Sequence, residues 1–499
     1  DIPSEYSTGS LYSVRVHGFC GNKYAYYFKI NGKRCIDPYA TRILGREKWN
    51  DKTRSDNDYE IACGIDSSDF DWKYDSFPEI TRDRMKLYKL HVRGFSMDVS
   101  GNKKHKGTFE AVSDRINYIK KLGFTSILLM PVYEFEEMTI PVKHDIPEYA
   151  KPKYSLKDEQ SVHTENDKVN FWGYTSGNYF AVKASYASDA SDASNELRRL
   201  VERLHKNGME CIVEMYFPDR TDHNLILDAL RYWVMSFHVD GFKLLGDRLP
   251  VTAIVQDALL SRTKILYDGF DMSVVPQNRT YENLYIDKEE YQFAARMMLN
   301  HINCNMYELL NQQKKQGENV GFINYISSNN GFTLSDLFMY NDRHNETNGE
   351  KNADGPSWNF SNNYGCEGPS RKRFIREIRK LKWKDAMLLL FLAQGVPMIM
   401  AGDEICNSQD GNNNAYCQDN PTGWVNWSNE HSRRENIRFL TRLIKFRDEH
   451  PVISCPKPFK FSDYKAVGYP DLSYHCKNAW IGECDATKLC VGVTVSYTH

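Results

Sequence analysis

The middle of the chain alternates short apolar segments with longer amphipathic ones. From residues 85–96 onward the pattern is strand, loop and helix, repeated, starting with "MKLYKLHVRGFS". Continuous apolar runs at 124–135 and 395–404 are typical of strands buried on both faces of a parallel sheet. The segment 194–208 has apolar residues at helical spacing and closes on Gly208, a common helix end. This alternation predicts βαβ units.

The same pattern extends the prediction along the chain. Further strands are expected at 209–217, 242–245, 263–271 and 320–327, and further helices at 109–123 and 225–241. Strands that alternate with helices over about 300 residues predict a (β/α)₈ TIM barrel with long loop insertions. The alternative is an open, doubly wound sheet. It is disfavoured because no glycine-rich phosphate-binding turn follows the first strand.

Both ends of the chain have a different pattern. Residues 11–45 alternate apolar and polar positions with Gly and Asn-Gly turns, which predicts antiparallel strands, and 51–60 are polar and predict a loop. Residues 472–499 return to β alternation. The predicted domains are a partial N-terminal β-sandwich segment (1–80), the barrel (81–448) and a partial C-terminal β-sheet segment (449–499). The chain could therefore be a piece of a longer protein.

Composition restricts the function classes. The chain is 41% hydrophobic and 26% charged with a formal net charge of -2, which argues against nucleic acid or an anionic membrane as partner. No apolar run reaches the roughly 20 residues that span a bilayer, and the first residues lack the plan of a signal peptide. Twelve cysteines without a C-x-x-C pair predict reduced thiols in a cytoplasmic protein, with no metal and no cofactor.

Several stretches carry a family resemblance. They are "GFTSILLMPVYEF", "NFWGYTSGNYFAVKASYAS", "VDGF", "GFTLSDLFMYNDRHNETNGEKN", "QGVPMIMAGDE" and "GNNNAYCQDNPTGWVNW". Together they resemble glycoside hydrolase family 13 of the alpha-amylase superfamily, and most nearly its isoamylase or glycogen-debranching type, from about residue 11 to the C-terminal segment. The resemblance implies a barrel that acts on α-glucans by a retaining mechanism with a nucleophilic carboxylate, an acid and a third stabilising group. It also implies that the N-terminal segment is part of a carbohydrate-binding sandwich.

The third and fourth strand ends depart from the family motifs. In "EMYFPD", Glu214 and Phe217 stand at the places of the motif's Asp and its aromatic residue, and Pro218 and Asp219 stand where Asn and His would be. On the fourth strand the usual Arg is Lys243 and the nucleophilic Asp is Leu245. Leucine can neither attack a sugar nor carry charge, and lysine lacks the planar fork that holds a carboxylate bidentately.

The fifth and seventh strand ends depart as well. Asp268 stands where the acid Glu belongs, and it is roughly 1.5 Å shorter in reach. Asn329 and Asn330 replace a His-Asp pair. Asn330 can hydrogen-bond a hydroxyl but supplies no negative charge to an oxocarbenium ion. The catalytic positions Leu245, Asp268 and Asn330 are therefore altered, which predicts a pseudoenzyme.

A shifted register is the alternative for the fourth strand. Asp247 would then be the nucleophile. Two residues further along a strand is a displacement of about 6.6 Å, whereas a retaining pair needs its carboxyl groups about 5 to 5.5 Å apart. We therefore favour the register that places Leu245 at the nucleophile position.

Aromatic and polar residues remain that could bind sugar. Trp172 and Tyr174 lie where the family stacks an aromatic ring on the sugar, although burial in the core is the alternative for Trp172. With Lys243, Asn329 and Asn330 they form the predicted substrate-binding set. Other features are expected to be structural or solvated: His91 and Arg93 on the first strand, the basic helix 371–385, and the polar loop 344–355, whose alternative is a calcium site.

Three functions stay open. The first is a non-catalytic barrel that binds glycogen-like α-glucan or maltooligosaccharide, or regulates an active glucan-metabolising enzyme. The second is a working retaining hydrolase or transferase with relocated carboxylates, for which Glu214, Asp247 and Asp268 are the candidates. The third is an assembly scaffold whose cleft is filled by its own side chains.

Overall fold

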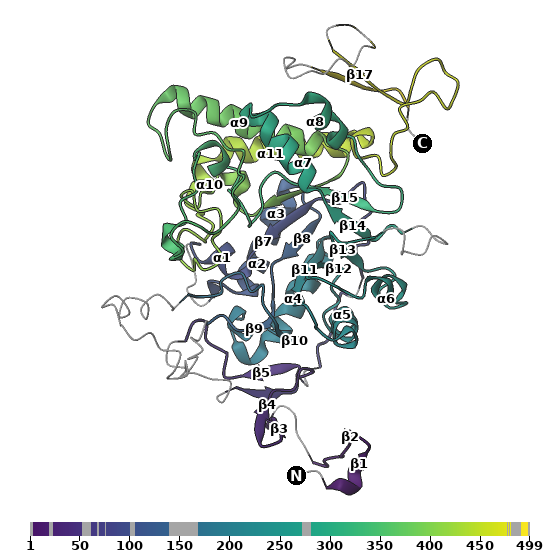
Figure 1. The fold of residues 1–499 in the computed structure, drawn as a ribbon, viewed down its shortest axis with the longest axis vertical. Coiled ribbons are helices and arrows are strands. Elements are labelled where there is room, and N and C mark those ends of the chain that lie inside the picture. Colours follow the sequence, from purple (N-terminus) through teal and green to yellow (C-terminus); the bar gives the residue numbers. More distant parts are fainter. Residues whose placement is uncertain are drawn as a thin grey trace, which may run out of the picture.

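The chain forms a barrel with small β-sheets at its two ends (Figure 1). The computed structural model describes residues 3–18, 23–51, 61–66, 69–74, 76–99, 105–138, 168–271, 281–476, 478, 480 and 491–497. Within these ranges no helix is long and apolar enough to cross a membrane.

Eight parallel strands close into a barrel. In chain order they are β7 (Leu87–Leu90), β8 (Ser126–Leu129), β11 (Glu210–Tyr216), β12 (Gly241–Leu245), β13 (Lys264–Leu266), β14 (Leu284–Asp287), β15 (Gly321–Asn324) and β16 (Val396–Met400). Each strand pairs with the next, and β16 pairs with β7. The predicted (β/α)₈ barrel is confirmed. The sequence pattern had not indicated β14.

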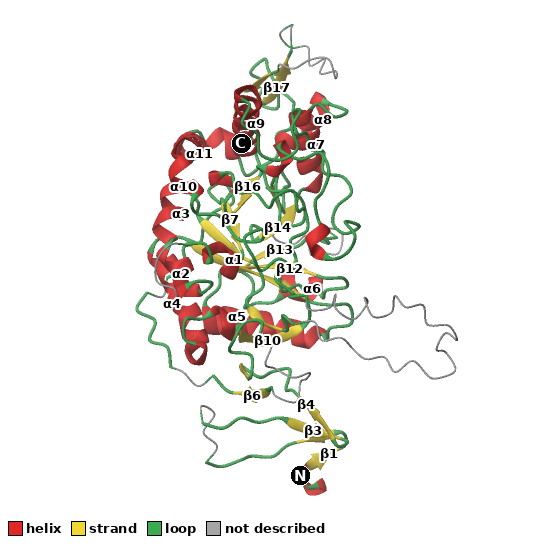
Figure 2. Ribbon diagram, turned by 90° about the vertical axis from the view of Figure 1, so that its left-hand side faces the viewer, coloured by secondary structure: helices red, strands yellow, loops and turns green. Residues whose placement is uncertain are grey.

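Helices cover the outside of the barrel (Figure 2). They are α1 (Val92–Ser96), α2 (Phe109–Asp114), α3 (Ile116–Leu122), α4 (Ala193–Lys206), α5 (His223–Phe237), α6 (Val251–Gln256), α7 (Glu289–Asn300), α8 (Met306–Gln313), α9 (Arg373–Leu392), α10 (Asn429–Ser432) and α11 (Arg434–Glu449). Side chains cap several N-termini: Thr108 accepts from Ala111 N, and Asp222 from Asn224 and Leu225 N. The helix expected at 109–123 is two helices, because Arg115 N donates to Val112 O, three residues back.

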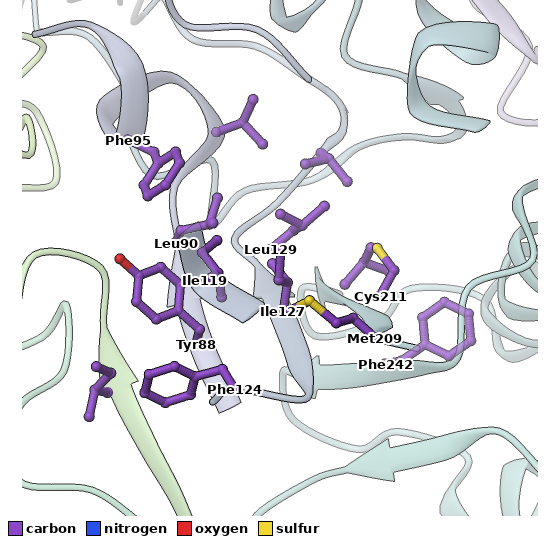
Figure 3. Close-up of a cluster of buried hydrophobic side chains, with 14 of the residues drawn as sticks. Tyr88, Leu90, Phe95, Ile119, Phe124, Ile127, Leu129, Met209, Cys211 and Phe242 are labelled. Carbon is purple, nitrogen blue, oxygen red and sulfur yellow. The ribbon is translucent and has the colours of Figure 1, made fainter. Parts of the chain in front are cut away.

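Side chains alternate between the barrel axis and the helices. Leu87, Leu128, Ile212, Leu266 and Ile323 belong to one buried cluster that fills the barrel. Their neighbours on the strands point outward into a second cluster, to which Ile127, Leu129, Cys211 and Phe242 belong together with Ile119 of α3 (Figure 3). A residue that follows a member of the barrel-filling cluster by two positions on the same strand must therefore also face the barrel axis.

Two local expectations were wrong. The run 124–135 is not one strand: β8 ends at Leu129, and Tyr133–Phe135 form β9, which pairs with β10 (Gly177–Val182). Pro131 explains the break, because it has no N–H to donate to a ladder. His91 and Arg93 do not lie on the first strand. His91 caps α1 by accepting from Gly94 N, and Arg93, inside α1, pairs with Asp419, so both are structural as expected.

Antiparallel pairs lie at the two ends of the chain. β1 (Ser7–Thr8) pairs with β2 (Leu11–Tyr12), β3 (Phe28–Ile30) with β4 (Lys33–Cys35), β5 (Arg42–Leu44) with β6 (Ala62–Gly64), and β17 (Leu472–His475) with β18 (Gly492–Val495). Asn31 and Gly32, at φ 50° and 79°, form the two-residue turn expected between β3 and β4. Residues 52–60 of the predicted loop are outside the described residues.

Candidate functional site

The C-terminal ends of the barrel strands carry a layer of charged side chains. Lys89, Glu214, Lys243 and Asp287 each lie two residues beyond an axial position, on β7, β11, β12 and β14. Glu214 is in register with Lys243 on the neighbouring strand. Strand alternation therefore directs all four side chains toward the axis at the barrel mouth. We call these four residues the charged layer.

Two side chains hold Glu214, one from β7 and one from the segment before β10. Lys89 Nζ lies 2.6 Å from Glu214 Oε1, and the Tyr174 hydroxyl donates to Oε2 at 2.5 Å. Lys89 Nζ also donates to Asn329 Oδ1 at 2.7 Å. Glu214 is fully buried, so these groups take the place of the water that would otherwise solvate its side chain. The structure thus brings together three residues from the predicted site, Glu214, Tyr174 and Asn329, around Lys89.

Lys243 forms the second ion pair of the layer, with Asp287. Burial opposes its charge, but Asp287, Glu214 and Asp268 outweigh burial and hold the pKa of Lys243 above its ordinary value. Burial lowers the pKa of Lys89, and Glu214 offsets part of that shift. Each cation of the layer therefore has its own carboxylate.

Leu245 is the last residue of β12. It lies beside Tyr216 of β11, and its carbonyl accepts from Phe217 N at 2.8 Å. The chain then turns at Gly246, where φ is 131° and an added Cβ would lie 2.0 Å from Phe217 O. The turn ends the strand's alternation and leaves Asp247 exposed. β12 does not continue to Asp247, so alternation along the strand does not direct this side chain toward the barrel axis. The structure therefore gives no support to the shifted register, in which Asp247 would be the nucleophile.

Asp268 lies beyond the end of β13 and is accessible to solvent. Its Oδ1 accepts from Asp287 N at 3.1 Å. Desolvation of its carboxyl and the like charge of Asp287 raise the pKa of Asp268, while Lys243 opposes the shift. Burial raises the pKa of Tyr267, and Asp247 and Asp268 raise it further, so both carboxylates act on that hydroxyl.

The remaining predicted residues have different surroundings. Asn330 is exposed, and Trp172 is buried in a cluster with Met130 and Phe171, which fits the core alternative. A cavity of about 50 Å³ lies against Trp172 and Asn329, and neither Leu245 nor Asp268 lines it. Sites that enclose a drug-sized ligand have volumes of roughly 300 to 1,000 Å³. The cavity at Trp172 and Asn329 is therefore much smaller than such sites.

Sequence reasoning missed two members of the charged layer. Lys89 was overlooked because it stands inside an apolar first strand, "LYKL", and Asp287 because the strand "LYID" was not recognised. A lysine in the middle of a strand buried on both faces was the available signal, since an unpaired charge is costly there. Asp287 had no comparable signal.

The polar loop 344–355 is an amide network. Asp354 Oδ2 accepts from Asn348 and Asn414 at 2.8 and 2.9 Å, and Asn345 Nδ2 donates to Asn413 Oδ1 at 2.8 Å. Among the described residues, no group of three or more His, Cys, Asp or Glu side chains could hold a metal ion. The amides bind one another and the neighbouring "NNN" segment.

The comparisons with known proteins agree with this architecture. Residues 75–223 match the alpha amylase catalytic domain model. The chain is 28% identical to "Isoamylase 1, chloroplastic" of Arabidopsis thaliana over 88% of this chain and 66% of that protein. It is 27% identical to "Glycogen debranching enzyme" of Enterobacter sp. (strain 638) over 90% of this chain and 76% of that protein. The resemblance to glycoside hydrolase family 13 is confirmed. The homologues are isoamylases and glycogen debranching enzymes, and the chain spans slightly less than two thirds of the length of the plant isoamylases that it matches.

Solved structures with the same fold include pullulanases. The apo pullulanase from Paenibacillus barengoltzii matches with a TM-score of 0.59 at 16% identity, over 90% of this chain and 73% of that one. The product complex of the multi-modular glycogen-degrading pneumococcal virulence factor SpuA matches with a TM-score of 0.61 at 18% identity, over 86% and 52%. At these identities the likeness establishes the barrel fold alone.

Proposed function

We propose that this protein binds α-glucan without hydrolysing it. The charged layer is the observation that carries the proposal: Glu214 and Asp287, the buried carboxylates at the barrel mouth, are each ion-paired to a lysine. A carboxylate held in this way is a poor nucleophile because attack on a sugar would leave a buried lysine unpaired.

Leu245 supports the same proposal. A retaining glycosidase forms a covalent bond between a carboxylate and the anomeric carbon, and leucine has no atom that can form it. Asp268 has the raised pKa of a general acid but no partner carboxylate at the Leu245 position. Proton donation alone does not supply the nucleophile.

Incubation with glycogen, pullulan and maltooligosaccharides tests both halves of the proposal. Affinity electrophoresis in gels with and without glycogen measures binding, and a reducing-end assay measures hydrolysis. We expect retardation by glycogen with no reducing ends above the buffer blank. Release of reducing ends that Asp268→Asn abolishes would overturn the non-catalytic part. Absence of retardation would overturn the binding part.

A second candidate function is supported by one observation. Asp247 and Asp268, which are both exposed, each raise the pKa of Tyr267, so both carboxylates act on one hydroxyl beyond the ends of β12 and β13. A hydrolase or transferase with relocated carboxylates would use this pair, whereas Glu214 is fully buried and bound. Activity lost in both Asp247→Asn and Asp268→Asn, and retained in Glu214→Gln, would establish this candidate.

The proposal also includes a protein partner and a cellular location. Regulation of an active glucan-metabolising enzyme is compatible with glucan binding, and co-purification with and without glycogen would test it. A cytoplasmic location remains a prediction that cell fractionation checks, since the plant relatives are chloroplastic by name.

A further inference from the structure

We infer that Trp358 is a second α-glucan contact, on the segment that follows the polar loop 344–355. Its side chain is 74% exposed, the largest fraction among the exposed large hydrophobic residues described. A large aromatic side chain that stays in water on a well-held loop is available to stack on a ligand. This inference rests on the proposed function, because the expected ligand is the same α-glucan.

An aromatic ring backs Trp358. The rings of Trp358 and Phe360 are nearly parallel, at 19°, with centroids 6.4 Å apart. Phe360 in turn meets Phe293 of α7 edge-on, with centroids 5.5 Å apart. The indole is therefore supported from one side while most of its surface faces solvent.

The backbone on both sides of Trp358 is held by buried polar groups. Asn413 Nδ2 donates to Pro356 O at 3.0 Å and to Asn359 Oδ1 at 2.9 Å. From α7, Asn300 Nδ2 donates to Phe360 O at 2.7 Å. The polar network of the 344–355 loop, to which Asn413 belongs, thus continues to the residues that flank Trp358.

Phe360 adopts a left-handed backbone conformation, with φ at 51°. A bulky side chain in this region is strained, at a cost of about 1–3 kcal/mol, and such strain persists only where the surroundings impose it. Here the hydrogen bond from Asn300 and the contact with Phe293 impose it, and the result is that the Phe360 ring lies beneath Trp358.

A held, exposed indole suits one face of a glucose ring. The C–H groups of a sugar face are apolar, and stacking buries them while the hydroxyl groups around the rim stay hydrated. Because the loop is already ordered, binding loses little conformational entropy. Unlike Trp172, which is buried, Trp358 can meet a glucan without any rearrangement.

Substitution of Trp358 tests the inference. Affinity electrophoresis on glycogen and calorimetry with maltohexaose would compare the wild type with Trp358→Ala, Trp358→Phe and Phe374→Ala. Phe374, on α9, is the matched control because it is an aromatic residue that is 72% exposed. We expect Trp358→Ala to weaken glycogen binding about tenfold, or about 1.4 kcal/mol, and Trp358→Phe to weaken it less. Thermal unfolding should be nearly unchanged in all three variants, because each substitution is at the surface.

The outcomes separate this inference from the proposed function. Loss of binding in Trp358→Ala but not in Phe374→Ala supports the inference. Wild-type binding that Trp358→Ala leaves unchanged overturns the inference alone. Absence of wild-type binding to either ligand overturns both proposals. Weakening by the same factor in Phe374→Ala would show a non-specific apolar effect and also overturns the inference.

Discussion

Removal of one lysine from the charged layer should destabilise the barrel strongly. In Lys89→Met the methionine keeps most of the side-chain length, but Glu214 loses its cation. The side chains are 4% and 0% exposed, so water cannot replace the lost partner. Breaking such a pair costs about 3–5 kcal/mol. Because Tyr174 still donates to Glu214, we expect a value near the lower end, about 3 kcal/mol.

The double variant Lys89→Met/Glu214→Gln should recover most of that loss. The glutamine oxygen can still accept from Tyr174, and no unpaired charge remains. The single variants should therefore not be additive, with a coupling energy of about 2–3 kcal/mol. Lys380→Met is the matched control: Lys380 pairs with Glu435 at 2.7 Å, but the side chains are 37% and 61% exposed. Its loss should cost less than about 1 kcal/mol.

Urea denaturation followed by circular dichroism and by tryptophan fluorescence would measure these differences. The two probes must coincide and the slope m must stay constant for the midpoints to report stability. A Lys89→Met variant within about 1 kcal/mol of the wild type would refute a stabilising role for the ion pair between Lys89 and Glu214. Additive single variants would refute the coupling between the two side chains.

Three further predictions concern repair, sugar contact and pH. Leu245→Asp alone should give no reducing-end release from glycogen, because catalytic groups act as a unit and Asp268 and Asn330 remain altered; measurable turnover from this single change would contradict that view. Tyr174→Ala should weaken maltooligosaccharide binding in calorimetry, because it removes the ring expected to stack on sugar; equal affinity in wild type and Tyr174→Ala would exclude the contact. Burial raises the pKa of Glu404 to about 7 from a usual 4.5, so the native carboxyl keeps its proton after the unfolded one has lost it. The free energy of unfolding should therefore fall by about 3 kcal/mol as pH rises from about 4.5 to 7, and Glu404→Gln should flatten that slope in urea titrations at several pH values; an unchanged slope would show that other groups cause it.

The barrel could be predicted from the sequence because its signals are local. Apolar runs such as 395–404, helical spacing such as 194–208 and the Asn31-Gly32 turn act through short-range backbone preferences. The substitution at Leu245 is equally local, since a side chain without an acidic group cannot be a nucleophile in any fold. The errors also have local causes: Pro131 ends β8, and Arg115 separates α2 from α3.

What the sequence determined by itself is the barrel, the resemblance to glycoside hydrolase family 13 and the absence of a carboxylate at position 245. Which charges pair at the barrel mouth was decided only by the tertiary structure. Lys89 and Glu214 are 125 residues apart along the chain, and no local pattern relates them. Closure of the barrel brings β7 and β11 to opposite sides of β8, so that residues on separate strands point toward one axis. The exposure of Trp358 and the burial of Trp172 were settled in the same way, because each depends on the segments that pack around the ring and not on its neighbours in sequence.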